Sequence, residues 1–427
     1  MKYPKALHKY EEKINRFAQL KAELGSKKIY KIIDEITEYL DSKIEIIEQL
    51  SDGERFNEPS TYKEILEQSN VNNLETKSID DKQYFSKLQG AIIGRFAGCA
   101  LGAPVELLSI GELEYFAKEV DHSFPPVDYW PKAPNGFFPR YKNGAGNHFT
   151  KEGMTFLSTD DDIAYTLLSL LLIEKHGKAF TKNNLAELWK AYLPVECTFT
   201  AERTTIDNLL NGLPVDEAGV KGNYDTEFIG ASIRCDGYGY INPGNPLEAS
   251  KLAFIDASLS HQRSGIYSSM YFAAVISMAF TSSDIIDTMY EALNVIPKDS
   301  LFHTEIMWAL DNRDVVSNYK IANQMVTEKF KGMSWVHAIN NACLTVWGIC
   351  IGKNNFEKGI SETVAMAYDN DCTAATVGSV LGSYLGIDAI GTHWYKPWNN
   401  TIRSYLKGIE TFDLDDIIKR YYCLRSI

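Results

Sequence analysis

The sequence predicts an all-α protein. Across its 427 residues, apolar side chains recur at the three- and four-residue spacing of amphipathic helices. The strict alternation expected of half-buried strands is nearly absent. The third observation is a set of small residues on single helical faces, such as Gly90, Gly94, Gly98 and Gly102. With 45% hydrophobic and 23% charged residues, the chain is an ordinary globular sequence, long enough to bury a sizeable core.

Residues 1–80 form an N-terminal extension whose pattern of charged and apolar residues differs from that of the rest of the chain. Lys and Glu alternate with Ile and Leu at helical spacing, which predicts two or three amphipathic helices. Breaks are expected near Gly25 and in the stretch SDGERFNEPST. Such helices must pack on something. The extension is therefore either a structural collar on the main domain or a surface for a partner protein.

The second part, residues 83–427, is expected to be one compact helical domain. Its composition shifts to Gly, Ala and Leu. The segment 121–158 carries no clear element, and a loop of this length in a compact domain is often functional. Helical patterns are predicted over 84–102, 161–176, 183–192, 200–211, 247–260, 265–281, 284–295, 300–310, 334–351, 356–367, 373–385, 400–410 and 413–423.

The overall charge narrows the class of partner. The formal net charge is −13, which disfavours non-specific binding to nucleic acid or to an anionic membrane. The seven cysteines form no CxxC pair, so neither a disulfide framework nor a thiolate zinc site is indicated. The first residues lack the apolar core of a secretory signal, and no apolar run reaches the length of a membrane span. A cytoplasmic protein is expected.

Two clusters of aspartate stand immediately before strongly apolar helices: Asp160–Asp162 and the pair Asp369 and Asp371. One interpretation is helix capping, in which an Asp side chain satisfies free N–H groups and complements the helix dipole. One cap needs one acid, however, and buried like charges raise each other's pKa. A divalent cation such as Mg²⁺ would remove that cost. If the two helix starts face each other, they would form a cage for one or two ions.

The glycine-rich stretch LQGAIIGRFAGCALGAPVELL is the third feature. Its glycines recur every four residues, which indicates close packing against another helix. Pro104 ends the helix, and Glu106 follows on the exit loop. Glu106 is either a solvated loop acid or a group that reaches the metal or a substrate hydroxyl.

Taken together, these motifs resemble the ADP-ribosylglycohydrolase family, which includes the dinitrogenase-reductase-activating glycohydrolases. The range Gly94 to Glu106 matches the family's opening pattern G-x-x-x-G-[DC]-x-L-G-x-P-x-E, with Cys99 at the variable position. The family's acid pair at a helix start is matched best by Asp161 and Asp162, with Asp160 in the preceding ligand position. The pairing of Asp160 with Asp161 stays open.

Three further pieces follow in the family's order. They are IGASIRCDGYGYINPGNP, DASLSHQRSGIY, which contains Ser260, and the stretch DNDC from Asp369 to Cys372. The resemblance spans about Gln83 to Tyr421 and leaves residues 1–80 outside. Cys99, Ile163, Asn370 and Cys372 depart from the commonest family residues, and the family usually has a hydroxyl ligand at the position of Cys372.

The resemblance implies an orthogonal helical bundle of the ADP-ribosylglycohydrolase type with a binuclear Mg²⁺ (or Mn²⁺) centre in a cleft. The implied metal ligands are Asp160, Asp161, Asp162, Asp369, Asp371 and Cys372. The residues implied at the catalytic step are Glu106, Asp161 and Asp371. Those implied to contact the ADP-ribose are Gly230, Ala231, Ser232, Arg234, His261 and Tyr267.

The implied activity is Mg²⁺-dependent hydrolysis of the glycosidic bond between ADP-ribose and an acceptor, such as an arginine side chain or another ADP-ribosylated molecule. The alternative is a catalytically weak ADP-ribose binder, or an immunity protein that neutralises an ADP-ribosylating toxin through its extension. The expected partners are an ADP-ribosylated protein or small molecule, and a protein that docks on residues 1–80. Thr200, Glu202 and Arg203 are either structural or placed around the site.

Overall fold

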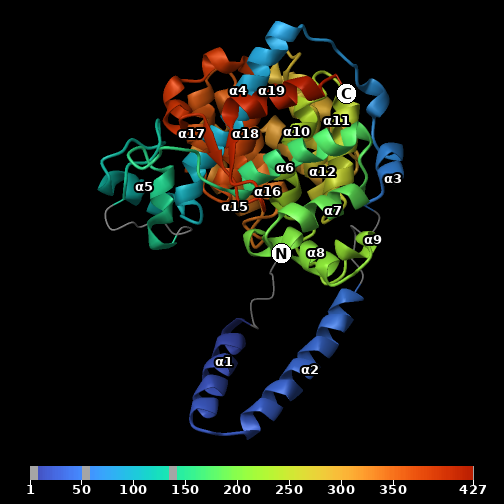
Figure 1. Cartoon of the computed structure of the whole chain (residues 1–427), viewed down its shortest axis with the longest axis vertical. Helices are drawn as coiled ribbons and strands as arrows, with labels where there is room; N and C mark the ends of the chain where they lie inside the picture. Colours follow the sequence, from blue (N-terminus) through green and yellow to red (C-terminus); the bar gives the residue numbers. More distant parts are fainter. Residues whose placement is uncertain (1–7, 51–57, 134–141, 427) are drawn as a thin grey trace. The chain divides into compact units, whose positions relative to one another are not determined.

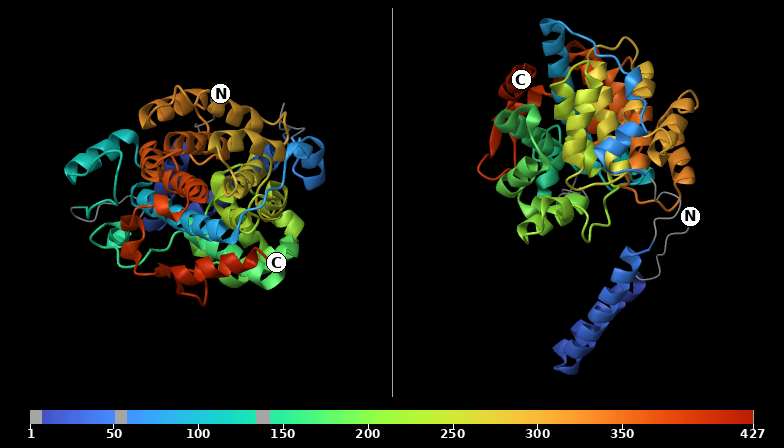
Figure 2. Two further views of the ribbon diagram at one scale, coloured as in Figure 1. Left: turned by 90° about the horizontal axis from the view of Figure 1, so that it is seen from above. Right: turned by 90° about the vertical axis from the view of Figure 1, so that its right-hand side faces the viewer.

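The computed structural model describes residues 8–50, 58–133 and 142–426, and it divides into two compact units. The first unit comprises Met1–Glu58 with Lys331–Met333, and the second comprises Pro59–Phe330 with Ser334–Ile427. Both are helical, so the predicted all-α class is confirmed. Each unit is described separately below (Figures 1 and 2).

The first unit is a helical hairpin of α1 (His8–Glu23) and α2 (Lys28–Glu48). The two helices are separated at Gly25, which has a φ of +80°, a backbone conformation that glycine adopts without steric cost. The break predicted at this position is confirmed. The second predicted break begins at residues 51–57, which lie outside the described residues.

The second unit begins before the boundary that the sequence suggested. Ile65, on α3 (Tyr62–Glu67), is fully buried, and the backbone N–H of Lys77 donates to the carbonyl of Gly244 at 2.9 Å. Residues 59–80 therefore pack as part of the larger unit.

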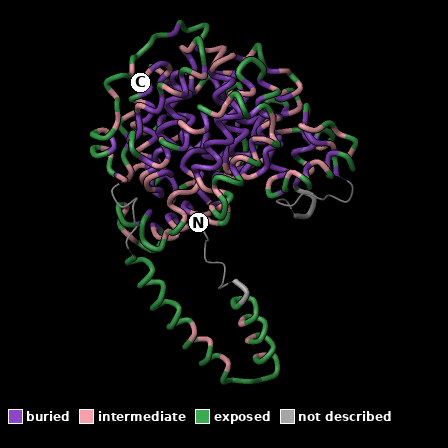
Figure 3. Tube along the Cα trace, turned by 180° about the vertical axis from the view of Figure 1, so that it is seen from behind, coloured by how far each residue is buried: buried purple, intermediate pink, exposed green. Residues whose placement is uncertain are grey.

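The larger unit is a bundle in which helices from distant parts of the chain lie side by side (Figure 1). Its buried residues are concentrated inside this bundle (Figure 3). After α3, its first helices are α4 (Asp81–Gly102), α5 (Ile110–Glu119), α6 (Asp161–His176), α7 (Lys182–Tyr192), α8 (Thr200–Leu210), α9 (Val215–Ala218), α10 (Asp236–Tyr240) and α11 (Pro246–Ala257). They are followed by α12 (Ser264–Ala279), α13 (Ile285–Ala292), α14 (Leu301–Asp311), α15 (Tyr319–Lys329), α16 (Ala338–Gly352), α17 (Phe356–Ala365), α18 (Asn370–Leu385) and α19 (Leu414–Leu424).

Most of the predicted helices of this unit are confirmed, with ends that differ by a few residues. The helix predicted over 400–410 is wrong. Strand β1 (Thr401–Arg403) lies there and pairs antiparallel with β2 (Thr411–Asp413). The two residues before it, Asn399 and Asn400, have φ values of +49° and +59° and so cannot start a helix. Helices α5, α9, α10 and α15 were not predicted, and each is short, with between 4 and 11 residues.

The central contact of the bundle joins α4 to α18 along their glycine faces. A Cβ added at Gly94 would lie 2.2 Å from the carbonyl oxygen of Gly378, and one added at Gly90 would lie 2.6 Å from that of Gly382. Glycine is required on both sides because the two backbones touch. The close packing predicted for the glycine-rich helix is therefore observed. The helix that packs against it is α18, which is rich in small residues and carries Asp371.

Helix α4 is well specified by its own sequence. The side chain of Asp80 caps its start by accepting hydrogen bonds from the N–H groups of Lys82 and Gln83, both at 3.0 Å. Over Asp81–Val105, this helix has the length and mean hydropathy of a membrane span, but 94% of its most apolar window is buried inside the protein. It is therefore explained as the core helix of the bundle.

We predict that Gly94→Ala lowers the free energy of unfolding by about 3 kcal/mol, because the added methyl group meets backbone that cannot move aside. The matched control is Gly111→Ala in α5, where an added Cβ meets no atom within 4 Å. This change should raise stability by about 0.5 kcal/mol through helix propensity. Urea unfolding of both variants measures the difference. Equal stabilities would contradict the close contact.

Candidate metal centre and adjoining pocket

The first acid cluster lies at the start of α6. Asp160 is the N-cap residue, and its Oδ1 accepts a hydrogen bond from the backbone N–H of Asp162 at 3.1 Å. Asp162 is fully buried, whereas Asp161 is partly exposed. Capping therefore accounts for Asp160 but does not explain the burial of Asp162.

The second acid cluster lies at the start of α18. Asp369 occupies the N-cap position, but its side chain makes no capping hydrogen bond in the described chain. Asp371 is fully buried in the first turn of the helix. Capping thus does not account for Asp369.

The two clusters meet in space. Three overlapping groups each place their ligand atoms within 4.8 Å of one another. They are Cys99 with Asp160 and Asp162, then Asp162 with Asp371 and Cys372, and finally Glu106 with Asp369 and Asp371. Residues more than 200 positions apart are joined in this way, and Asp162 and Asp371 link the three groups.

The electrostatics of Asp162 show the cost of this arrangement. Burial raises the pKa of Asp162 well above its usual range, and the neighbouring Asp371 and Asp160 raise it further. The positive charge of Arg95 opposes these effects without cancelling them. Without a counter-ion, this environment therefore disfavours the charged form of the carboxyl.

Asp369 behaves in the same way. Burial raises its pKa, and the charges of Asp371 and Glu106 add to the effect. Burial and then Asp162 also raise the pKa of the Cys372 thiol, which keeps it neutral. A neutral thiol is a poor ligand for a hard cation, so this chemistry favours the carboxylates as ligands over Cys372.

These acids fit a divalent cation. Within the described residues, Asp162 Oδ2 and Asp369 Oδ1 are buried and have no hydrogen-bond partner. Carboxylate oxygens are the ligands that Mg²⁺ and Mn²⁺ prefer. The positive ends of the α6 and α18 dipoles meet the same cluster and offset part of its charge. A cation would supply the remainder.

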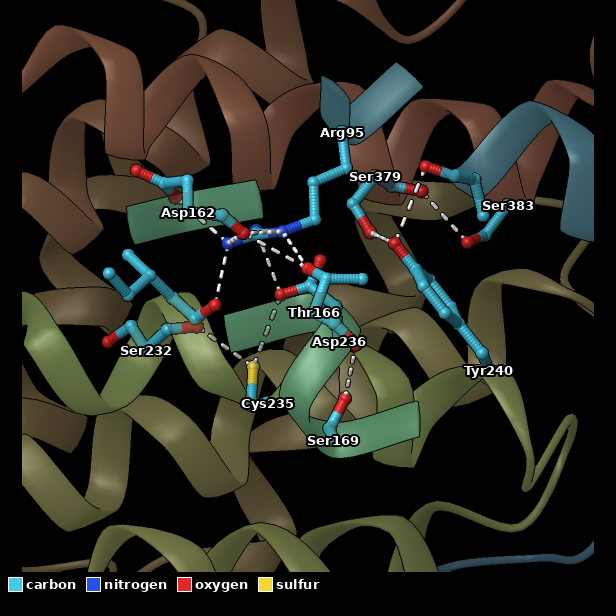
Figure 4. A network of polar contacts seen from close by, with 12 residues as sticks. Arg95, Asp162, Thr166, Ser169, Ser232, Cys235, Asp236, Tyr240, Ser379 and Ser383 are labelled. Carbon is cyan, nitrogen blue, oxygen red and sulfur yellow. Dashed lines mark hydrogen bonds and ion pairs between the residues drawn. The ribbon is translucent and has the colours of Figure 1, made fainter. Parts of the chain in front are cut away.

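Arg95 fixes the position of Asp162 (Figure 4). Its Nη2 donates to Asp162 Oδ1 at 2.8 Å, and its Nη1 pairs with Asp236 Oδ2 at 2.9 Å. Its Nε donates to Thr166 Oγ1 at 2.8 Å, also on α6. Because Arg95 holds one oxygen of Asp162, the other oxygen, Oδ2, is the one left for a cation.

Arg95 was not singled out from the sequence, although a signal was present. It is the one charged residue between Gly90 and Gly102 of α4, which is otherwise apolar. A charge in such a helix must be paired when it is buried. Burial alone would lower the pKa of Arg95, but the neighbouring carboxylates of Asp236 and Asp162 raise the pKa above its ordinary value. The arginine therefore stays charged.

A pocket of about 450 Å³ opens beside the acid cluster. Part of its lining is acidic, with Glu106, Asp161 and Asp369. The remainder is largely apolar and aromatic. It comprises Leu107, Tyr165, Phe199, Thr200, Glu202, Phe228, Ile229, Gly230, Ile233, Ser334, Trp335, Val336 and Cys372. A volume of this size accommodates an organic ligand rather than an ion alone.

The family model for ADP-ribosylglycohydrolases matches residues 80–422 of this chain. The chain belongs to the ADP-ribosylglycohydrolase family. The match covers the acid clusters, the glycine-rich helix and every predicted site residue, and it begins close to the predicted domain start at residue 83.

One similar solved structure is titled "ADP-ribosylglycohydrolase-related protein complex". The two chains are 18% identical, and the TM-score is 0.49. The match covers 81% of this chain and 99% of the other. No curated protein matches the chain.

Of the residues that the family resemblance placed along ADP-ribose, Gly230 lines the pocket. A Cβ at this position would lie 2.3 Å from Glu202 Oε1, so the glycine makes room for that carboxylate. Arg234 lies behind the pocket wall and is 2% exposed. Its guanidinium pairs with Glu202 and Asp256, and it also bonds to Gly230 O at 3.3 Å and Ser260 Oγ at 3.1 Å.

The Arg234 cluster explains the position of Glu202, one of three residues whose role the sequence left open. Burial raises the pKa of Glu202 to about 7, although Arg234 lowers it. Its Oε1 lies 4.0 Å from His261 Nε2, but burial and then Arg234 lower the pKa of this histidine well below its usual value. The histidine is therefore neutral, and the contact is not an ion pair. Glu202 is a polar group of the pocket wall that Arg234 holds in place.

The remaining predicted substrate contacts lie away from the lining of this pocket. Ser232 is hydrogen-bonded to Ser268 at 2.6 Å between their hydroxyl oxygens, and the hydroxyl of Tyr267 donates to the carbonyl of Pro59. His261 Nδ1 lies 2.8 Å from Ser260 Oγ. These residues and Ala231 are buried. Their contact with a ligand stays a prediction.

We predict that Arg234→Ala destabilises the protein by about 3–5 kcal/mol, because it leaves the buried carboxylates of Glu202 and Asp256 without a counter-charge. The control is Arg203→Ala, which removes the exposed ion pair with Asp207 and should cost less than about 1 kcal/mol. Chemical denaturation of both variants compares them. A loss for Arg234→Ala no larger than that for Arg203→Ala would contradict the assigned role.

Proposed function

We propose that this chain is a Mg²⁺-dependent hydrolase that cleaves the glycosidic bond between ADP-ribose and an acceptor. The observation that carries the proposal is the meeting of the two aspartate clusters and Glu106 beside a pocket large enough for an organic ligand. Membership of the ADP-ribosylglycohydrolase family supports the reaction class. The proposed acceptors are ADP-ribosylated protein side chains, such as arginine or serine, or ADP-ribosylated small molecules.

The proposed metal ligands are Asp160, Asp161, Asp162, Asp369 and Asp371. When bound, Mg²⁺ or Mn²⁺ would orient ribose hydroxyls and water and would offset the buried negative charge. Arg95 binds Oδ1 of Asp162 and leaves Oδ2 for a cation. Asp160 caps the first turn of α6. The protein thus presents ligand atoms that need little rearrangement.

Glu106 is the proposed proton-transfer group. Its carboxylate lies in the pocket lining and forms a group with Asp369 and Asp371. In glycoside hydrolysis the transition state resembles an oxocarbenium ion, and a carboxylate assists by moving a proton. If the anomeric carbon lies beside the acid groups, a water molecule that attacks it would lie within reach of Glu106.

The aromatic residues of the pocket lining suit a nucleoside. Phe199, Phe228 and Trp335 provide aromatic surface, and Phe199 and Trp335 keep part of it exposed. Such faces stack on planar bases. Glu202, fixed by Arg234, would accept a hydrogen bond from a ligand N–H or O–H group. Aromatic surface for a base, together with acids and a cation site for a ribose, is the combination of groups expected for ADP-ribose.

A second candidate is ADP-ribose binding without efficient turnover, including toxin neutralisation through the N-terminal extension. The neutral Cys372 thiol favours it, because the resemblance expects a hydroxyl ligand at that position. The exposed apolar residues of the extension also suit a protein partner. Retained ADP-ribose binding with no release from any ADP-ribosylated acceptor would favour this candidate.

We predict that Asp371→Asn lowers the release of free ADP-ribose at least about 100-fold, because it removes a carboxylate that two ligand groups share. The matched control is Asp388→Asn, an exposed acid in the turn after α18, which should keep full activity. The assay incubates each protein with Mg²⁺ and ADP-ribosylated arginine or serine substrates and quantifies ADP-ribose by liquid chromatography. Wild-type-like turnover by Asp371→Asn would refute the proposal.

Binding of Mg²⁺ should depend on pH. Because burial raises the pKa of Asp162 and Asp369, a cation competes with protons for them, so affinity should increase as the pH is raised from the acidic to the neutral range. Calorimetric titration in buffers with different ionisation enthalpies would show proton release on binding. Affinity that is unchanged across this range, with no proton release, would contradict a site built from these acids.

A further inference from the structure

Two of the seven cysteines lie within the acid cluster. All seven are in the described part of the chain, and there Cys99 and Cys372 are the cysteines that enter a group of possible ligands. Cys99 forms one group with Asp160 and Asp162, and Cys372 forms another with Asp162 and Asp371. In each group the sulfur and the carboxylate oxygens lie within 4.8 Å of one another. Each group therefore presents one sulfur and two carboxylates to a cation.

Apolar packing does not account for the surroundings of these thiols. A buried free cysteine usually behaves as a small apolar side chain. Cys372 is instead hydrogen-bonded to Asp369, and it lines the pocket together with Glu106. Cys99 is fully buried and has two carboxylates as close neighbours. Both thiols therefore have the surroundings of a ligand.

The backbone contact between α4 and α18 fixes the position of Cys99. A Cβ added at Gly98 would lie 2.0 Å from the carbonyl oxygen of Ala374, and one added at Gly102 would lie 2.5 Å from the Cα atom of Asp371. Cys99 lies between these two glycines on the same helix. Its backbone is therefore held at the start of α18, as a preorganised ligand requires.

Asp162 belongs to both cysteine groups and is the side chain that points to a bound cation. It is fully buried, and Arg95 donates to its Oδ1 at 2.8 Å. Its Oδ2 has no hydrogen-bond partner among the described residues. A buried carboxylate oxygen is costly unless a proton or a cation occupies it. A cation bound by Asp162 would have the sulfur atoms of Cys99 and Cys372 among its nearest candidate ligands.

The sulfur atoms change which cations suit the cluster. Mg²⁺ prefers oxygen ligands, so a thiol adds little to its binding. Zn²⁺ accepts Cys sulfur together with carboxylate oxygen, and Co²⁺ precedes it in the general order of affinity for such ligands. When such an ion binds, a metal–sulfur bond forms and the thiol proton leaves to solvent. The thiolate that remains neutralises one charge of the ion.

We propose that Cys99 and Cys372 are sulfur ligands for a borderline divalent cation, such as Zn²⁺, at the acid cluster. Asp162 is the carboxylate ligand that both groups share. The inference rests on the metal centre of the proposed function and extends it, because it assigns to this site a class of cation other than Mg²⁺ and Mn²⁺. It does not require cleavage of a glycosidic bond.

The test uses Co²⁺ as a coloured substitute for Zn²⁺, added to the full-length chain after a chelator has removed bound metal. Sulfur bound to Co²⁺ gives a charge-transfer absorption in the near ultraviolet, which oxygen ligands do not give. The wild-type chain should show this absorption, and added Zn²⁺ should abolish it by displacing Co²⁺. Calorimetric titration measures the binding of Co²⁺, Zn²⁺ and Mg²⁺ independently of the absorption.

The test variants are Cys99→Ser, Cys372→Ser and the two changes combined, since a serine hydroxyl is a harder ligand than a thiol. Each single variant should weaken the absorption, and the double variant should remove it. The double variant should also bind Zn²⁺ at least about 10-fold more weakly, with Mg²⁺ binding unchanged or tighter. The matched control is Cys343→Ser with Cys423→Ser, one buried and one exposed cysteine outside the ligand groups, which should bind as the wild type does.

Co²⁺ that binds without the absorption would overturn the proposal, as would the absence of Co²⁺ binding. An absorption that persists in the double variant, or that is lost in the control, would overturn it as well. A single variant with full absorption would overturn the role of that cysteine. The wild-type spectrum needs no variant, and circular dichroism reports whether each variant folds.

The outcomes also separate this inference from the proposed function. Release of ADP-ribose with Mg²⁺ but no sulfur absorption with Co²⁺ would overturn the cysteine ligands and leave the hydrolase proposal in place. Sulfur absorption without release from any ADP-ribosylated acceptor would support the cysteine ligands and count against the hydrolase.

Discussion

The burial of several carboxylates at one point is the constraint on which the rest of the structure depends. Asp162, Asp369 and Asp371 are withdrawn from water together, with Arg95 as the cation held against Asp162. Arg95 is also shared with Asp236, so it cannot balance the cluster. Such a charge is tolerated when the acids hold protons or when a cation binds. The raised pKa values of Asp162 and Asp369 show the first solution, and the proposed function depends on the second.

The packing of the bundle serves this cluster. Gly94 of α4 and Gly378 of α18 let two backbones touch, which brings Arg95 on one helix and Asp371 on the other to the start of α6. A second buried arginine, Arg234, fixes Glu202 at the pocket wall in the same manner. Each arginine therefore fixes a carboxylate by an ion pair: Arg95 fixes Asp162 in the acid cluster, and Arg234 fixes Glu202 in the pocket lining. This arrangement keeps polar groups of the site in place before any ligand binds.

Much of this organisation could be predicted from the sequence. The excess of acids over the needs of capping made a shared cation site one of two interpretations, and the family resemblance implied that the aspartate clusters meet. The glycine spacing predicted a close helix contact. The partner of the small-residue face of α18 could not be derived, because spacing does not say which helix lies opposite. The role of Arg234 shows a similar limit: a motif position does not reveal that Glu202 and Asp256 occupy the guanidinium. The wrong prediction of a helix over 400–410 has a local cause, because Asn399 and Asn400 adopt backbone conformations with positive φ.

The most direct test of the central claim is an anomalous diffraction experiment on crystals of the full-length chain soaked in Mn²⁺. Manganese scatters anomalously and binds the same hard oxygen ligands as Mg²⁺. The account predicts a strong anomalous peak within coordination distance of Asp162 and Asp371, and no such peak in crystals of Asp371→Asn. Full Mn²⁺ saturation with no peak near either carboxylate would contradict it.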